Sequence, residues 1–361
     1  MSHYEQRLES DLNAIRDHMR SLSTRAGDAV EEALRSLLSG NRKLAYATIL
    51  GDGWINERTR EIDGLCHRFI ARHLPSAGHL RYTSAVIRTS LQLERIGDYA
   101  VTIAREGVQL SAPPEGAILR QLEMMSGQAN GMLAQSIAAF NEGNDEKART
   151  AMGLAAAMEG TMDGIYADLV STSDPGRIKD LVALFVVFNL IKRVADQAKN
   201  ICEETLFAVT GETKHARVHD VLFVDEDGAG LSQMAAAIAE RSYPDAARYA
   251  AAGRSPASGV DPGLRAFLEQ RGFDLSAAAP AALDVSPGAL SKYFVVVSLS
   301  GPIRDYATQL PFHTSALEWD VGSLSQGLDA AALEQRLEDL YREVSSHVHA
   351  LVETLRGEEV D

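Results

Sequence analysis

The 361-residue chain is poor in cysteine and has no long apolar segment. Cys66 and Cys202 are its only cysteines, so it cannot form a disulfide framework or a cysteine-rich zinc site. The longest apolar run, residues 181–191, is too short to span a bilayer, and the charged N-terminal segment has no apolar signal core. We therefore expect a cytoplasmic protein without membrane insertion, whose two cysteines are buried on apolar helical stripes.

Basic residues are also in short supply. Lys and Arg total 35 against 50 for Asp and Glu, which gives a net charge of −15. Such a charge repels a phosphate backbone, and no Lys/Arg run offers a local basic patch, so we expect no nucleic-acid partner. The 45% hydrophobic content predicts a well-folded chain, and its length predicts about two domains at roughly 150 residues each.

Residues 4–211 have the pattern of long helices. Apolar residues recur at spacings of three and four, beginning with Leu8, Leu12, Ile15, Met19 and Leu22. Breaks at 40–41, 75–78 and 113–114 separate the first stretches, and further periodic stretches cover 115–141, 145–171 and 176–209. Long helices with short connections pack antiparallel. We predict two three-helix bundles in tandem, residues 1–112 and 113–214.

An internal repeat supports this division. The segment from Leu93 to Ile103 aligns with that from Ile191 to Ile201, with Arg, Asp, Ala and Ile coinciding at four places. Helical periodicity alone matches apolar positions, but not Arg and Asp together.

Residues 215–361 have a different pattern. Strand-like runs at 218–224, 249–253, 293–298 and 316–321 alternate with helical stretches near 232, at 261–271 and at 302–309. A long amphipathic stretch, 329–355, follows them. This alternation predicts a small α/β domain with a parallel sheet and a C-terminal helix.

Four oxygen-bearing side chains form the candidate site. Glu94 and Asp98 lie four residues apart on one predicted helix, and Asp52 and Asn56 share that spacing on the preceding one. If these helices pack antiparallel, the four side chains converge and suit Mg²⁺, Ca²⁺, Mn²⁺ or iron. Alternatively they form a solvated acidic face, where repulsion costs only about 0.2–0.5 kcal/mol. Gly97, inside the helix, predicts the close approach of a neighbouring element.

The second repeat differs at the matching positions, which are Ala155, Glu159, Lys192 and Asp196. A lysine ammonium can stand where a cation would lie. We therefore expect a Lys–carboxylate pair there rather than a metal.

The segment LERIGDYAVTIA, residues 93–104, resembles the signature of PhoU proteins, accessory regulators of phosphate uptake. Asp52-Gly-Trp-Ile-Asn56 fits the approach to it, and KRVADQAKNICEETLFAVTGE, residues 192–212, fits the second copy more loosely. The resemblance covers about residues 3–214 and implies a six-helix, two-repeat fold. It also implies a metal cluster of Fe, Mn or Mg at Asp52, Asn56, Glu94 and Asp98, with no organic cofactor.

The resemblance to PhoU proteins implies regulation without catalysis. Such proteins restrain the phosphate ABC transporter and the phosphate-starvation response through contacts with the transporter ATPase and the sensor histidine kinase, usually as homodimers. The same partners, and a homodimer, are therefore expected for this chain.

Residues 218–327 resemble low-molecular-weight protein tyrosine phosphatases and arsenate reductases, through VLFV, a loop and SQMAAAIAER. That family carries Cys-x5-Arg-Ser after the first strand, but Asp225 and Leu231 stand at the Cys and Arg places and only Ser232 is kept. The family's late Asp-Pro is also missing, since Gly322 follows WDV. The expected domain is a pseudophosphatase.

Two alternative functions stay open. The carboxylates could serve a metal-dependent phosphoester hydrolase, or the C-terminal domain could sense phosphate or another oxyanion. The acidic loop of Asp225, Glu226 and Asp227 would favour a cation, or simply be solvated.

Overall fold

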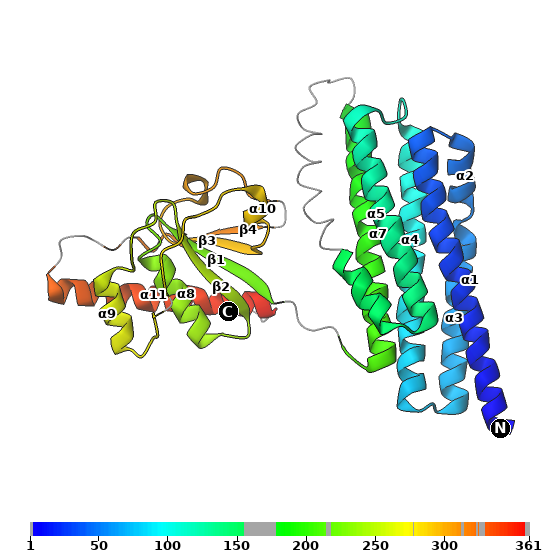
Figure 1. Ribbon diagram of the computed structural model, residues 1–361, viewed down its shortest axis with the longest axis horizontal. Coiled ribbons are helices and arrows are strands. Elements are labelled where there is room, and N and C mark those ends of the chain that lie inside the picture. Colours follow the sequence, from blue (N-terminus) through cyan, green and yellow to red (C-terminus); the bar gives the residue numbers. More distant parts are fainter. Residues whose placement is uncertain are drawn as a thin grey trace. The chain divides into compact units, whose positions relative to one another are not determined.

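A computed structural model describes residues 3–154, 178–213, 218–276, 278–311, 314–322, 324 and 329–357. The chain divides into two compact units, Met1–His215 and Ala216–Asp361. The first is helical and the second combines a sheet with helices (Figure 1). A mainly helical chain with bundles, a small parallel sheet and a C-terminal helix is therefore confirmed.

Long helices running side by side make up the first unit, called here the helical unit (Figure 1). They are α1 (His3–Ser39), α2 (Arg42–Leu50), α3 (Asp52–His73), α4 (Ala77–Gln109), α5 (Gly116–Glu142) and α7 (Ile178–Thr210). Residues 145–154 are also helical. The predicted helix at 145–171 extends into residues outside the described ones.

Apolar stripes explain how these helices pack. Leu12, Ile15, Met19 and Leu22 on α1 are at most 1% exposed, as their spacing predicts. They belong to one continuous core that includes residues of α3, α4, α5 and α7. The most extensive helix–helix contact joins α4 to α7, which carry the two copies of the repeat.

The predicted second helical stretch is divided in the structure. α2 begins after Asn41, whose side chain accepts a hydrogen bond from the Leu44 N–H at 3.1 Å, and it ends at Gly51. A Cβ on Gly51 would lie 2.5 Å from Arg25 Nη2, so the guanidinium of α1 occupies the space beside this turn. α3 then begins at Asp52. Glycine thus permits a close approach between α1 and the α2–α3 junction.

The second unit, called here the α/β unit, contains a parallel sheet in the order β2-β1-β3-β4. The strands are β1 (His219–Asp225), β2 (Ala247–Gly253), β3 (Val295–Ser298) and β4 (Ser315–Glu318). Alternation along β1 directs Val221 and Phe223 into one core with α8 (Leu231–Ser242), α9 (Pro262–Gln270) and α11 (Ala330–Arg356). Leu222 and Val224 join a smaller core on the other face, with Leu290 of α10 (Pro287–Leu290).

Two short elements differ from the sequence prediction. The helix expected at 302–309 is only a 3₁₀ turn, η2 (Ile303–Asp305), which follows Pro302 and a Gly301 with φ of +73°. α10 was not predicted, because four residues are too few for a periodic pattern. In the part of the chain that the structure describes, no helix is long and apolar enough to cross a membrane.

Candidate functional site

Asp52 and Asn56 lie together at the start of α3. Asn56 Nδ2 donates a hydrogen bond to Asp52 Oδ2 at 2.9 Å, which confirms that the spacing of four places both on one face. Both side chains are half-buried. Asp52 is in the first turn of α3, where the helix dipole favours a negative charge.

Glu94 and Asp98 lie on α4, which packs against α3. The contact is close at Gly97, where an added Cβ would lie 2.9 Å from Ile55 Cδ1. The predicted close approach at this glycine is therefore confirmed. It brings the α4 acids near Asp52, because Ile55 and Asp52 are less than one turn apart on α3.

The mutual proximity of the acids appears in their pKa values. Burial raises the pKa of Glu94 above its ordinary value, and the charges of Asp98 and Asp52 raise it further. Burial also raises the pKa of Asp98, again with a contribution from Asp52. Three carboxylates from two helices thus repel one another, and a cation would relieve that repulsion.

The unpaired oxygens at this place suit a cation. Among the described residues, Asp52 Oδ1 and Asn56 Oδ1 are buried and have no hydrogen-bond partner. Carboxylate and amide oxygens are ligands for Mg²⁺, Mn²⁺ or iron. However, no group of three or more His, Cys, Asp or Glu side chains in the described ranges is arranged to hold a metal ion. The residue types fit a cation, whereas the side-chain positions do not form a complete ligand set.

In the second repeat, the two positions on α7 form an ion pair. Lys192 Nζ lies 3.2 Å from Asp196 Oδ2, in an i,i+4 arrangement. The lysine side chain therefore supplies a positive charge at the position that Glu94 occupies in the first repeat. Ala155 and Glu159, the other two matching positions, lie outside the described residues.

The loop after β1 holds no nucleophilic thiol. Asp225 ends β1 with 5% of its surface exposed, and Leu231 begins α8 with 3% exposed. The Asp225 carboxylate accepts hydrogen bonds from the N–H groups of Gly228 (2.6 Å) and Ser232 (2.8 Å). Asp225 is thus a buried acceptor inside the loop, contrary to the expectation of a solvated acidic loop, because the loop folds around it. Glu226 and Asp227 are exposed.

Both cysteines are buried in the helical unit. Burial raises the pKa of the Cys66 thiol to about 12, and it does the same for Cys202. Neither thiol is therefore ionised near neutral pH, which is unsuitable for a nucleophile.

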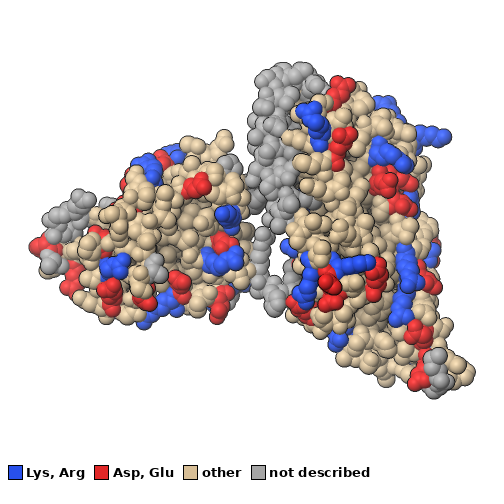
Figure 2. Space-filling model, viewed as in Figure 1, with Lys and Arg blue, Asp and Glu red and all other residues tan. Residues whose placement is uncertain are grey.

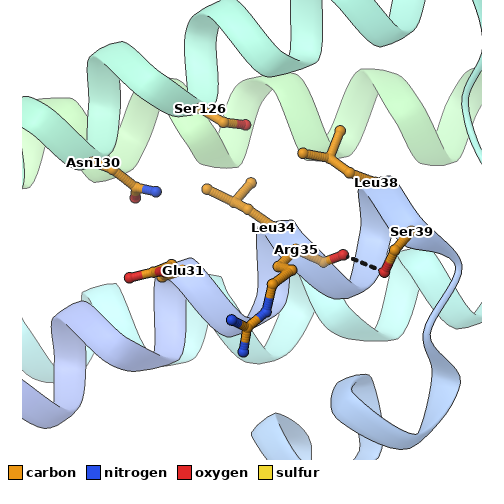
Figure 3. A pocket seen from close by; sticks show the side chains of 7 residues that line it. All are labelled: Glu31, Leu34, Arg35, Leu38, Ser39, Ser126 and Asn130. Atoms are coloured by element: carbon orange, nitrogen blue, oxygen red, sulfur yellow. Dashed lines mark hydrogen bonds between the residues drawn. The ribbon is translucent and has the colours of Figure 1, made fainter.

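A surface hollow of about 330 Å³ between α1 and α5 was missed by the sequence analysis (Figure 3). Ser126 Oγ is buried there and has no hydrogen-bond partner among the described residues. The hollow is lined by Glu31, Leu34, Arg35, Leu38 and Ser39 from α1 and by Ser126 and Asn130 from α5. Sequence gives no signal for it, because it depends on how two helices distant in the chain are aligned.

Charges on the visible face of the helical unit are mixed. Figure 2 shows Lys and Arg interspersed with Asp and Glu there, without a broad region of one sign. This surface does not have the concentrated basic character of a nucleic-acid interface.

Comparisons with known proteins identify the helical unit. Residues 19–107 and 122–205 each match the PhoU domain. A Pseudomonas putida protein named "Phosphate-specific transport system accessory protein PhoU homolog" is 26% identical over 262 residues, covering 70% of this chain and 95% of that protein. A Pseudomonas aeruginosa protein of the same name is 27% identical over 218 residues, covering 58% and 88%. These relatives are named as accessory proteins, not as enzymes.

Solved structures agree with this assignment. The crystal structure of PhoU from Pseudomonas aeruginosa matches with a TM-score of 0.54 and 25% identity, covering 56% of this chain and 99% of that one. An oxidised arsenate reductase gives a TM-score of 0.32, at 20% identity over 38% of this chain and 99% of that one. The helical unit therefore matches the PhoU domain twice in tandem, and it is similar to PhoU proteins in both sequence and fold.

Proposed function

We propose that the protein is an accessory regulator of phosphate transport that acts through contacts with other proteins and catalyses no reaction. The observation that carries this proposal is the pair of PhoU domains, at 19–107 and 122–205. It is supported by relatives named as accessory proteins of a phosphate-specific transport system, which this chain covers over 95% and 88% of their length. The proposed setting is the cytoplasm.

The proposed partners are the ATPase of a phosphate ABC transporter and a sensor histidine kinase, with the protein acting as a homodimer. Exposed apolar side chains around the α2–α3 junction support a contact surface in the helical unit. Leu50 is 83% exposed, Tyr46 52% and Trp54 37%, and these residues recur every four positions. Apolar side chains exposed in this number favour association with another protein.

A bound divalent cation or iron is proposed as part of this surface. Asp52, Asn56, Glu94 and Asp98 would hold it through their oxygens, and its charge would offset the repulsion among the three carboxylates. The buried, unpartnered oxygens of Asp52 and Asn56 support this assignment. Since Asp52 lies two residues beyond Leu50, a bound ion would fix the segment that carries the exposed apolar residues.

The alternative of a phosphoester hydrolase has less support. Hydrolysis at such a site needs a metal ion that several protein ligands hold and that activates a water molecule. The described residues contain no ready group of three such ligands. The relatives' printed names also describe accessory proteins rather than hydrolases.

The regulatory function is tested by deleting the gene and measuring phosphate uptake in phosphate-replete cells. We expect derepressed uptake and excess polyphosphate, both restored by the wild-type chain. Unchanged phosphate handling in the deletion strain would contradict the proposal.

The contact surface is tested separately by co-purification with the ATPase and the kinase. Leu50→Asp should reduce recovery of either partner at least several-fold. Leu74→Asp is the matched control, since Leu74 is 86% exposed and lies at the other end of α3. Equal loss with both variants would argue against a surface at the α2–α3 junction.

A further inference from the structure

Four carbonyl groups at the loop between β1 and α8 are turned toward a neighbouring segment. The oxygens of Asp225, Glu226, Asp227 and Ala229 all accept hydrogen bonds from one neighbouring segment. The donors, in the same order, are the N–H groups of Arg254 (3.3 Å), Ser255 (2.8 Å), Ala257 (2.9 Å) and Asp261 (3.0 Å). In a trans peptide the N–H points opposite to the preceding C=O. The N–H groups that follow these carbonyls are therefore directed to the inside of the loop.

Inward N–H groups make the loop a cradle for negative charge. Successive backbone N–H groups that converge on one point form an anion-binding concavity. The N-terminus of α8, twelve residues long, begins at Leu231 and adds its dipole with the same sign.

The side chain of Asp225 occupies this cradle. Its Oδ1 accepts from Gly228 N–H at 2.6 Å and its Oδ2 from Ser232 N–H at 2.8 Å. The residue is only 5% exposed, and among the described residues no Lys or Arg forms an ion pair with it. A buried carboxylate without a cationic partner is costly unless N–H donors surround it. Burial raises the pKa of Asp225 above its ordinary value, and the N–H donors of the cradle offset part of that rise.

The cradle is held in shape by contacts that do not involve the Asp225 side chain. A Cβ on Gly253 would lie 2.2 Å from the Gly228 nitrogen, so β2 and the loop touch through their backbones. Gly228 also has a φ of +64°, which favours glycine. These contacts and the four outward carbonyl bonds remain when the Asp225 side chain is removed.

We propose that the Asp225 carboxylate acts as a built-in anion that closes an oxyanion cradle in the α/β unit. The wild-type unit consequently takes no free oxyanion, and shortening this one side chain opens the cradle to a tetrahedral oxyanion such as phosphate or tungstate. The unit is then a closed binding module, and any response of the wild-type protein to phosphate does not originate in this loop.

The test is calorimetric titration of the full chain with sodium tungstate and with inorganic phosphate. Asp225→Ala should bind one tungstate per chain at least tenfold more tightly than the wild type, with phosphate competing for it. Asp225→Asn should stay close to the wild type, because the amide still fills the cradle. Tungstate should also raise the unfolding temperature of Asp225→Ala and leave that of the wild type unchanged.

Asp227→Asn is the matched control for charge. Asp227 is exposed and its Oδ1 accepts from Ala229 N–H at 3.0 Å, so this variant removes one negative charge from the same loop without emptying the cradle. If Asp227→Asn binds tungstate as tightly as Asp225→Ala does, anion binding depends on the negative charge of the loop and not on whether the Asp225 side chain fills the cradle. That result would overturn the proposal.

Two further results would overturn it. One is tight tungstate binding by the wild type, abolished by Asp225→Asn. The other is a folded Asp225→Ala chain, verified by circular dichroism, that binds neither anion above the wild-type level. Should Asp225→Ala fail to fold, Asp225→Ser is titrated instead, since its hydroxyl retains one acceptor for the loop, and the same outcomes apply.

Discussion

Arg88 on α4 and Glu204 on α7 join the two PhoU domains through an ion pair. Arg88 Nε donates to Glu204 Oε1 at 2.6 Å, and Nη2 lies 2.6 Å from Oε2. Arg88 Nη1 also donates a hydrogen bond to Ser84 Oγ at 2.8 Å. The Arg88 guanidinium carbon lies 4.7 Å from the centre of the Phe207 ring, which further fixes its orientation. The two oxygens of Glu204 therefore meet a guanidinium that is already oriented, which reduces the entropy lost on pairing.

The Arg88–Glu204 pair should contribute measurably to stability. In a double-mutant cycle with Arg88→Met and Glu204→Gln, we expect a coupling free energy of about 1 kcal/mol in chemical unfolding, at the upper end for partly exposed pairs. The more exposed pair of Arg149 and Glu212 serves as the control and should give less coupling. Equal coupling free energies in the two pairs would contradict the prediction that the Arg88–Glu204 pair stabilises the fold more than an exposed ion pair does.

Gly97 should tolerate no larger residue. Gly97→Ala introduces a Cβ 2.9 Å from Ile55 Cδ1, and we expect a loss of about 1–3 kcal/mol in unfolding free energy from overpacking. Ile55→Val in the same chain should recover part of the loss. Gly127→Ala on α5 has open space and should instead stabilise by up to about 1 kcal/mol, measured by the same denaturant titration. A neutral Gly97→Ala would contradict the close approach of α3 and α4.

Asp98→Asn should raise stability in the absence of metal. The raised pKa of Asp98 means that its stabilising contribution is complete below the ordinary carboxylate pKa and is lost as pH rises through the raised value. In a chelator at pH 7 the variant should therefore be more stable than the wild type, by a few tenths of a kcal/mol. That difference should disappear at about pH 3.

Emission spectroscopy of the purified chain completes this test. Wild type should retain Fe, Mn or Mg, and Asp98→Asn should retain less. Asp63→Asn is the control and should retain the wild-type amount, because Asp63 lies on the same helix as Asp52 with its side chain 51% exposed. Equal metal content in all three chains would leave the four oxygen ligands without a role.

Protonation of the Asp11 carboxylate should lower the free energy of unfolding in acid. A hydrogen bond with His73 lowers the pKa of Asp11, and Arg72 lowers it further. Its contribution is therefore present above the ordinary carboxylate pKa and lost as pH falls through the lowered value. Asp11→Asn should cost about 1–2 kcal/mol at pH 7 and flatten the decline in unfolding free energy between about pH 4 and 2. If the unfolding free energy of Asp11→Asn falls as steeply with pH as that of the wild type, other carboxylates cause the decline.

The sequence predicted those parts of the site that depend on local spacing. Periods of three and four residues are enough to place Asp52 beside Asn56 and to bury the α1 stripe, because both follow from helix geometry alone. The close neighbour predicted at Gly97 is also present, although glycine inside a helix does not always have one, as the open space at Gly127 shows.

Features that depend on distant parts of the chain escaped prediction. Gly51 separates α2 from α3, and the guanidinium of Arg25 packs against it. Arg25 lies on α1, 26 residues before Gly51 in the chain. Sequence alone also suggested an exposed acidic loop at Asp225, because the donors around its carboxylate are backbone groups. Backbone direction is not encoded in residue type, whereas side-chain charge is.

The inaccessibility of both native thiols makes the protein convenient for site-specific chemistry. Cys66 and Cys202 are fully buried and are protonated near neutral pH. A maleimide dye or spin label should therefore react selectively with one cysteine introduced at the surface, without replacing either natural residue. Pairs of such probes, one in each unit, would report distances between the PhoU domains and the α/β unit directly in solution.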